Sequence, residues 1–97
     1  MPADEPMDTI DEQMLDGNAV GGMLIGLFGV EMTHVPGRCA NCHKVSMVGA
    51  LKAYTRGPGV VLRCPWCGQV VMRLVHRGDE VLVDMRGAML LRFPAPG

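Results

Sequence analysis

Aromatic residues are scarce in this sequence. Among its 97 residues there are only four: Phe28, Tyr54, Trp66 and Phe93. A chain of this length forms one domain and buries only about 60–70% of the surface that its unfolded state exposes. With so few large side chains the hydrophobic core is modest.

Long apolar runs are also missing. The apolar run at residues 23–30 is far too short to span a bilayer, which takes about 20 residues. The first residues are acidic, whereas a secretory signal begins with a basic region. We therefore expect no membrane association and a cytoplasmic location, where close cysteine pairs are metal ligands more often than disulfides.

Positive charge is missing from the start of the chain. Residues 1–16 hold six acidic residues and no Lys or Arg, whereas residues 17–97 hold all nine basic residues and four acidic ones. The second part therefore has a formal charge of +5, which predicts a mildly basic surface. Residues 1–8 lack apolar periodicity and predict a disordered acidic tail, followed by a single domain at 9–93 and a frayed tail at 94–97.

Two short cysteine pairs stand out among the residues that are present. Cys39 and Cys42 form one C-x-x-C motif, Cys64 and Cys67 form another, and 21 residues lie between the motifs. Two close pairs of thiolates separated by enough chain for a β-hairpin are typical of a tetrahedral Zn²⁺ site. We therefore predict a four-cysteine zinc ribbon. Such a metal contributes about 10–16 kcal/mol, as much as the whole net stability of a typical domain, so its loss should unfold the ribbon.

Other metal groups fit these motifs less well. Residues 64–68 have the C-P-x-C-G form of rubredoxin-like iron sites, but such sites are surrounded by packed aromatic side chains that this chain lacks. Residues 39–43 match the haem-attachment motif C-x-x-C-H, an interpretation that leaves the second cysteine pair unused.

His43 is either a metal ligand or the residue that turns the chain after Cys42. We favour the turn, because His is one of the few non-glycine residues that adopt positive φ, and Gly68 holds the matching place.

The remaining pattern predicts one helix and several strands. Capping signals at 9–12 and 16–18 favour either one helix over 10–28 or a turn followed by a helix over 17–28, with Gly29 as its C-terminal cap. Strands are expected at 30–35, 45–54, 60–63, 69–76 and 81–85, and a strand or a helical turn at 89–93. The predicted fold class is small α+β: an N-terminal helix packed on an antiparallel four-cysteine zinc ribbon with two knuckles and two hairpins.

Further short motifs accompany the cysteine pairs. They are Leu15-Asp16-Gly17-Asn18-Ala19, Phe28-Gly29-Val30-Glu31-Met32-Thr33, Tyr54 with Pro58-Gly59, Arg63 before Cys64, and Asp84-Met85-Arg86-Gly87. Over residues 8–87 the chain thereby resembles a family of short actinobacterial proteins catalogued only as a domain of unknown function, with His43 where a glycine is expected. The resemblance implies zinc and a cytoplasmic setting, and it implies no activity.

Enzymatic activity is not expected. A catalytic zinc keeps an open coordination position, whereas four cysteines normally close the shell. The sequence has no catalytic triad, phosphate-binding glycine loop or paired carboxylate motif. His34 and His76 are single residues on predicted strands, where we expect them to face solvent.

Two classes of function remain. The first is a protein-interaction module, whose partner is a second copy or another protein bound at the apolar helix near 17–28; adaptable methionine side chains favour this class. The second is a nucleic-acid-binding zinc ribbon, with Trp66 or Tyr54 as stacking surface. Its candidate phosphate contacts are the basic residues around the ribbon, Arg38, Lys44, Lys52, Arg56 and Arg63. Four thiolates around Zn²⁺ would lower the charge of residues 17–97 from +5 to about +3. That charge supplies only a few such contacts, so we rank protein interaction first.

Overall fold

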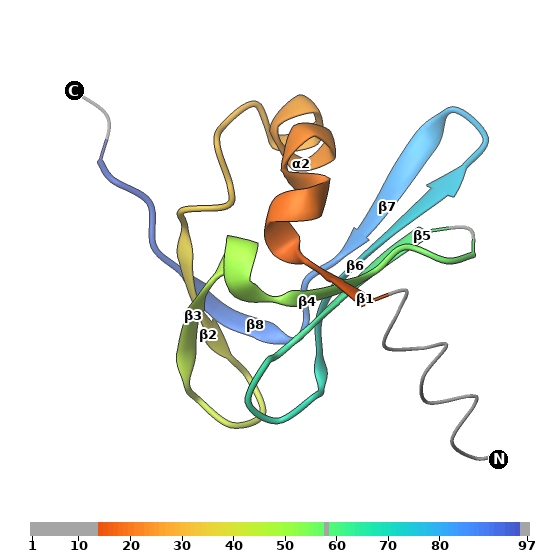
Figure 1. The fold of residues 1–97 in the computed structure, drawn as a ribbon. Helices are drawn as coiled ribbons and strands as arrows, with labels where there is room; N and C mark the ends of the chain where they lie inside the picture. The colour runs from red at the N-terminus through yellow and green to blue at the C-terminus, as the bar shows by residue number, and fades with distance from the viewer. Residues whose placement is uncertain (1–13, 58, 96–97) are drawn as a thin grey trace, which may run out of the picture.

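The computed structural model describes residues 14–57 and 59–95. Within them the chain forms one α-helix, two 3-10 helices and eight strands (Figure 1). In chain order these are β1 (Met14–Asp16), η1 (Gly17–Val20), α2 (Gly21–Phe28), β2 (Pro36–Cys39), β3 (Val45–Met47), η2 (Val48–Ala50), β4 (Lys52–Tyr54), β5 (Gly59–Arg63), β6 (Val70–Arg77), β7 (Glu80–Asp84) and β8 (Ala88–Leu91). The predicted tail at residues 1–8 lies outside the described residues.

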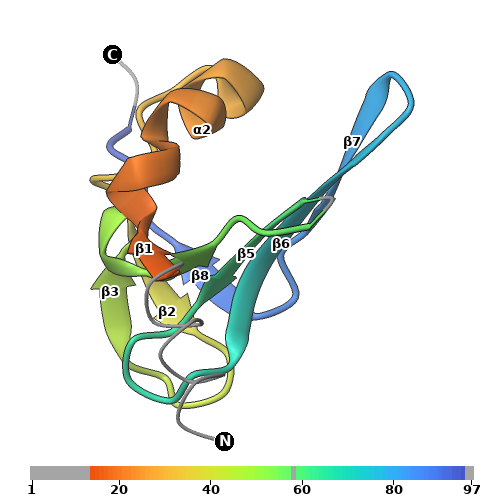
Figure 2. The same ribbon diagram turned by 45° about the vertical axis from the view of Figure 1, so that its right-hand side comes forward.

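The strands form two antiparallel sheets. Five strands make the larger sheet in the order β1-β4-β5-β6-β7, and three make the smaller sheet in the order β3-β2-β8. Helix α2 lies above the junction of the two sheets, and the β6–β7 hairpin projects away from this junction on one side (Figures 1 and 2). The predicted small α+β class with antiparallel sheets is therefore confirmed.

The helix begins later than the longer of the two predictions. Residues 14–16 form strand β1, which pairs with β4, so a single helix over 10–28 is wrong. The shorter prediction is closer, with 3-10 geometry at 17–20 and α geometry at 21–28. Gly29 ends the helix as predicted: its φ is 77°, and its N–H donates to the carbonyl of Ile25.

The predicted strand at 30–35 is wrong. Residues 30–35 form a turn and an irregular segment, and β2 begins only at Pro36. Glu31 sets this turn, since its carboxylate accepts hydrogen bonds from the backbone N–H of Thr33 at 3.0 Å and from its hydroxyl at 2.6 Å. The Thr33 hydroxyl bond, the larger of the two effects, and the Thr33 N–H bond hold the pKa of Glu31 below its usual value. A local side-chain bond has thus replaced the strand ladder that the β-branched residues suggested.

The predicted single strand at 45–54 is two strands in the structure, β3 and β4. β3 and β4 belong to different sheets, and the 3-10 turn η2 lies between them. The N–H of Val48 donates to the carbonyl of Val35, and that of Gly49 to the carbonyl of Thr33, both at 2.9 Å. The chain therefore passes from one sheet to the other in the middle of the predicted strand.

The two later hairpins follow the prediction. β4 pairs with β5 and β6 pairs with β7, with Arg77 opposite Glu80 across the second turn. Residues 88–91 form a strand rather than a helical turn, and β8 pairs with β2.

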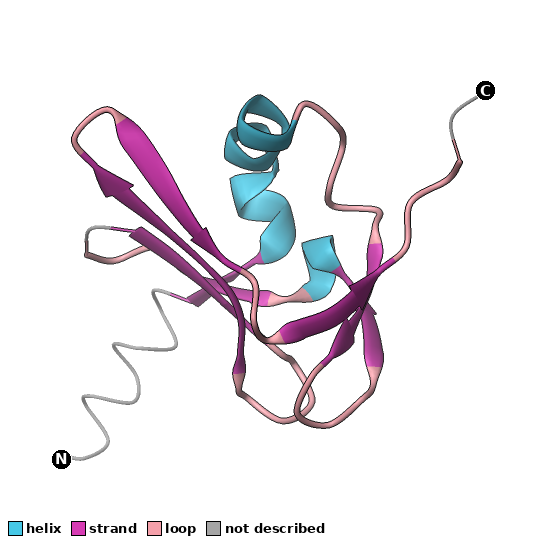
Figure 3. Ribbon diagram, turned by 180° about the vertical axis from the view of Figure 1, so that it is seen from behind, coloured by secondary structure: helices cyan, strands magenta, loops and turns pink. Residues whose placement is uncertain are grey.

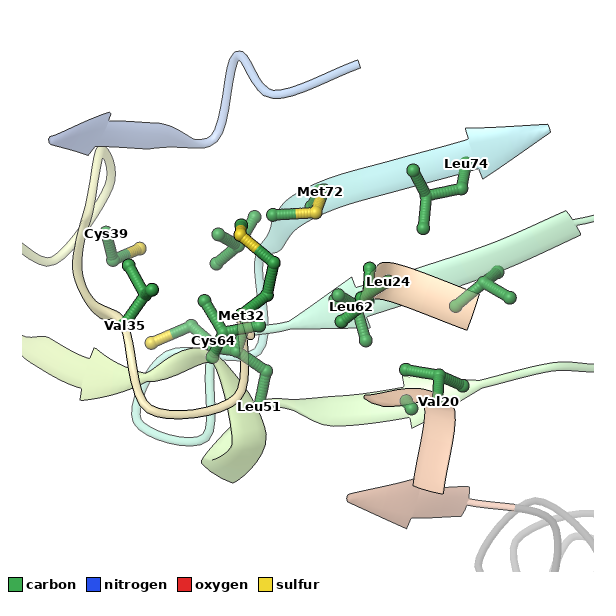
Figure 4. Packing of buried hydrophobic residues seen from close by; sticks show 14 residues of the cluster. Val20, Leu24, Met32, Val35, Cys39, Leu51, Leu62, Cys64, Met72 and Leu74 are labelled. Carbon is green, nitrogen blue, oxygen red and sulfur yellow. The ribbon is translucent and has the colours of Figure 1, made fainter. Parts of the chain in front are cut away.

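One hydrophobic cluster joins the helix and both sheets (Figure 4). Its fully buried members include Leu24 of α2, Leu62 of β5, and Met72 and Leu74 of β6. Methionine takes the place of the missing aromatics in this core, since Met32 and Met72 are at most 1% exposed. The sulfur atoms of Cys39 and Cys64 lie at one end of the same cluster (Figure 4).

Helix α2 is buried on one face only. Leu24 is fully buried, whereas Ile25 and Leu27 are 43% and 38% exposed. The segment at 89–93 does not cover this face, since β8 lies beside β2 and Phe93 is itself 51% exposed. No helix within the described residues is long and apolar enough to cross a membrane.

Candidate metal centre

The four cysteines come from matching places in the two sheets. Cys39 is the last residue of β2 and Cys42 lies in the turn to β3, while Cys64 follows β5 and Cys67 lies in the turn to β6. These two turns, the knuckles, lie side by side at one end of the molecule (Figures 1 and 3). Two segments that are distant in the sequence thus deliver their thiols to one point.

The sulfur atoms are spaced as one metal ion would require. All four lie within 4.8 Å of one another. The Sγ atoms of Cys39 and Cys67 are 3.7 Å apart, as are those of Cys42 and Cys64. In a tetrahedron with Zn–S bonds of about 2.3 Å, the sulfurs are about 3.8 Å apart. All four cysteines are free thiols, and the cluster could hold one metal ion.

The two knuckles share one hydrogen-bond pattern around their first cysteine. The N–H groups of Asn41 and Trp66 point at the sulfurs of Cys39 and Cys64, both at 3.4 Å. The backbone N–H of the residue after each second cysteine, His43 or Gly68, donates at 2.9 Å to the carbonyl of the first cysteine of its own pair. N–H groups aimed at sulfur stabilise a thiolate, the form that binds a metal.

Both chain reversals use a left-handed residue, as predicted. The φ angle is 68° at His43 and 80° at Gly68. His43 is exposed and does not belong to the sulfur cluster. The structure therefore places His43 in the turn.

An arginine supports each knuckle, and the sequence reasoning missed this. Arg38 donates from Nη1 to the carbonyl of His43 at 3.1 Å, and Arg63 donates from Nη1 to the carbonyl of Gly68 at 2.8 Å. Each arginine stands directly before the first cysteine of its pair. The repeated R-C-x-x-C was the signal that could have revealed both contacts.

Further bonds attach the knuckles to the fold. The N–H of Ala40 donates to the carbonyl of Gly87 at 2.8 Å.

Trp66 does not cover the sulfur cluster, because its side chain is 60% exposed and lies toward the β2–β3 hairpin. The Lys44 ammonium lies 4.7 Å from the centroid of the Trp66 ring.

The environment separates the acidities of two of the thiols. For Cys67, the Asn41 side chain has the largest effect, and with the Gln69 N–H and bonds from neighbouring thiols it lowers the pKa to about 6. For Cys42, the Lys44 N–H favours the thiolate, but burial and hydrogen bonds to the other three sulfurs outweigh it and raise the pKa to about 11. Because the four sulfurs lie this close together, the thiols do not ionise independently of one another. A bound cation would neutralise the charge of the thiolates.

Most of the chain matches one known protein family. Residues 10–96 match the model of a family described as "Family of unknown function (DUF6510)". The chain belongs to the DUF6510 family. No curated protein and no solved structure matches it.

Two of the motifs that suggested the family contact the same turn, η2, in this DUF6510 chain. Gly17 of the Leu15–Ala19 motif lies against η2, where an added Cβ would be 2.0 Å from the carbonyl oxygen of Val48. Thr33, at the end of the Phe28–Thr33 motif, bonds to Gly49 of the same turn. The motifs thus fix the approach of η1 to η2.

The other candidate residues are dispersed. His34 and His76 are exposed, as expected, and lie outside the sulfur cluster. The five predicted phosphate contacts are divided, with Arg38 and Lys44 on the β2–β3 hairpin and the others on or beside the larger sheet. In this DUF6510 chain, the five basic residues are therefore spread over both sheets.

Proposed function

We propose that the protein is a zinc ribbon in which Cys39, Cys42, Cys64 and Cys67 bind one structural Zn²⁺, and that it acts as an interaction module without catalysis of its own. The observation that carries the metal proposal is the spacing of the four sulfurs, at 3.7 Å for two pairs and within 4.8 Å for all. Four thiolates complete a tetrahedral shell and leave no position for a substrate.

Zinc suits this environment better than iron. Rubredoxin-like iron sites lie among packed aromatic side chains, whereas the aromatic residue in these knuckles, Trp66, is 60% exposed. Cys42 and Cys67 are only partly buried. A redox-inactive ion tolerates such an exposed position, because no reduction potential has to be maintained there.

The metal would hold the two sheets together. Cys39 ends a strand of the smaller sheet, and Cys64 follows a strand of the larger one. Besides the hydrophobic cluster, a few hydrogen bonds link the knuckles to the rest of the fold. A cross-link of four metal–sulfur bonds at this point would fix the relative position of the sheets, which is the expected role of a structural zinc.

The exposed face of helix α2 supports the interaction role. The helix has the sequence GGMLIGLF, without a polar side chain, yet only Leu24 is buried within it. Ile25, Leu27 and the following Val30 are 38–46% exposed. A helix without polar side chains that exposes this much apolar surface is more typical of a binding surface than of the outside of a monomer. The occupant we favour is a second copy of the chain, because a two-fold axis needs no other protein.

Elemental analysis of purified protein tests the metal proposal. We expect one zinc per chain. Stoichiometric iron, or a folded reduced protein without metal, would contradict it.

Sedimentation at micromolar concentration tests the interaction proposal separately. We expect a dimer that Ile25→Asp dissociates without loss of zinc, since a buried unpaired carboxylate is costly. Leu82→Asp is the control, because Leu82 is 40% exposed on β7, away from the helix surface. A monomeric wild-type protein would rule out the dimer and leave the zinc proposal intact.

A further inference from the structure

A basic hollow lies on the face of the larger sheet that points away from the core. Its volume is about 250 Å³, and three arginines from three segments line it: Arg56 before β5, Arg63 at the end of β5, and Arg73 in β6. Gly59 and four valines, including Val61, Val70 and Val75, form the rest of its wall. The hollow shares no residue with the sulfur cluster or with helix α2.

The arginines of the hollow form no ion pair with an acidic side chain among the described residues. The two ion pairs in this part of the chain are Arg77–Glu80 and Arg86–Asp84. Lys52 also stands directly opposite Arg63 in the β4–β5 register. Like charges opposite each other destabilise a sheet, so this face is suited to an anionic occupant.

Two acids border the face, and one of them, Asp84, attracts Arg73 electrostatically. Asp84 lies opposite Arg73, but Arg86 occupies its carboxylate through bonds of 2.6 and 3.0 Å. Asp16 lies opposite Lys52 at the edge strand β1, beyond the hollow.

The walls of the hollow favour a peptide over nucleic acid. Bases bind by stacking on exposed aromatic rings, and Tyr54 beside the hollow is partly buried, with the Arg63 guanidinium 5.8 Å from its ring centroid. Trp66 is at the β2–β3 hairpin. Valine side chains suit aliphatic groups, while guanidinium groups pair with carboxylates.

The chain itself contains a segment of this composition. Residues 1–12 hold five acids, Asp4, Glu5, Asp8, Asp11 and Glu12, together with the apolar Met7 and Ile10 and no basic residue. Their own structure lies outside the described residues. The sequence supplies both kinds of side chain that the hollow would contact.

The segment can reach the hollow. It precedes β1, whose first residue, Met14, pairs with Tyr54. Arg56 follows Tyr54 by two residues, so the chain enters the sheet at the end where Arg56 lies. Strand β5 is two positions from β1, about 10 Å at about 4.8 Å per strand. Twelve extended residues span about 40 Å.

We propose that the acidic segment at residues 1–12 binds in the arginine hollow of its own chain, with carboxylates on Arg56 and Arg73 and an aliphatic side chain against the valines. The proposal goes beyond the proposed zinc and helix-interaction functions and depends on neither.

Nuclear magnetic resonance of the full-length, metal-loaded protein tests this contact. The comparison is a variant in which the five acids are replaced by Asn or Gln. We expect backbone amide shifts at Val61, Arg73 and Val75 that differ between the two proteins, independently of protein concentration, and that shrink at 0.5 M salt. Differences confined to residues 1–16, or differences that vanish on dilution, would overturn the proposal.

A polyanion probe provides the second measurement. A 12-nucleotide oligothymidylate should bind the neutralised variant at least about fivefold more tightly than the wild type, because the acids no longer compete for the arginines. Adding Arg73→Glu to the neutralised variant should remove this gain, whereas Arg92→Glu, an exposed arginine beyond β8, should not. Equal, Arg73-dependent binding by the wild type and the neutralised variant would mean that the hollow is open to nucleic acid, and would overturn the proposal.

Discussion

The indole nitrogen Nε1 of Trp66 donates a hydrogen bond of 3.0 Å to Oγ of Ser46. Trp66 belongs to the second knuckle, and Ser46 lies in β3, on the hairpin that carries the first. The bond therefore joins the two halves of the cysteine cluster from outside. The Lys44 ammonium lies over the same ring, which adds an electrostatic attraction of the cation–π kind.

Ser46→Ala should loosen this contact. We expect an unfolding free energy lower by about 0.5–1.5 kcal/mol, the net contribution of one hydrogen bond, with the lower end favoured because the bond is exposed. Trp66 is the only tryptophan, so acrylamide quenching of its fluorescence reports its mobility directly and should increase. Unchanged quenching would mean that the bond does not restrain the ring in solution.

Metal removal should unfold the domain. If zinc contributes about 10–16 kcal/mol, it exceeds the net stability of a domain with this core. Excess EDTA should abolish the strand signal in circular dichroism, and added zinc should restore it. EDTA saturated with zinc beforehand is the control. A chain that keeps its fold after its zinc has been removed would show that the core alone is sufficient.

Substitution at the two left-handed turn positions should have effects of different size on stability. Gly68→Ala places a Cβ at φ 80° and should lower the unfolding free energy by about 1–2 kcal/mol. His43→Gly removes a Cβ at φ 68° and should cost little, because relief of strain offsets the greater freedom of the unfolded chain. Urea titration of the zinc-loaded proteins measures both. Equal losses would show that the His43 side chain has a role beyond the turn.

The cysteine cluster was the most predictable part of this structure. The spacing of two C-x-x-C pairs restricts the geometry strongly, and Gly68 and His43 were identified because only certain residues tolerate positive φ. Antiparallel pairing and the strand at 59–63 also followed from β-branched residues between turn signals.

The connections between the sheets could not be predicted from the sequence in the same way. Residues 45–54 look like one strand, but the chain changes sheets at η2 because its N–H groups bond to Val35 and Thr33. Those partners are more than ten residues away in the sequence, so no local pattern contains the information. The same holds for 30–35, where the Glu31 carboxylate forms a local turn that outweighs the strand propensity.

Gly17 illustrates the same limit and leads to the last prediction. From the sequence it served as a capping signal, whereas in the structure it provides space for the backbone of η2. A Cβ at Gly17 would lie 2.0 Å from the carbonyl oxygen of Val48 and 3.0 Å from Cα of Gly49. Both are backbone atoms, so they move only if η2 shifts with its bonds to Val35 and Thr33.

Gly17→Ala should therefore destabilise the fold by about 2–4 kcal/mol, in the range of severe core substitutions. Gly22→Ala is the matched control, because Gly22 is exposed in α2 with open space around its Cβ position. That change should instead stabilise the helix by up to about 1 kcal/mol. Urea titrations of both zinc-loaded variants make the comparison. If the two substitutions had similar effects, the close approach of η1 to η2 would not limit the size of residue 17.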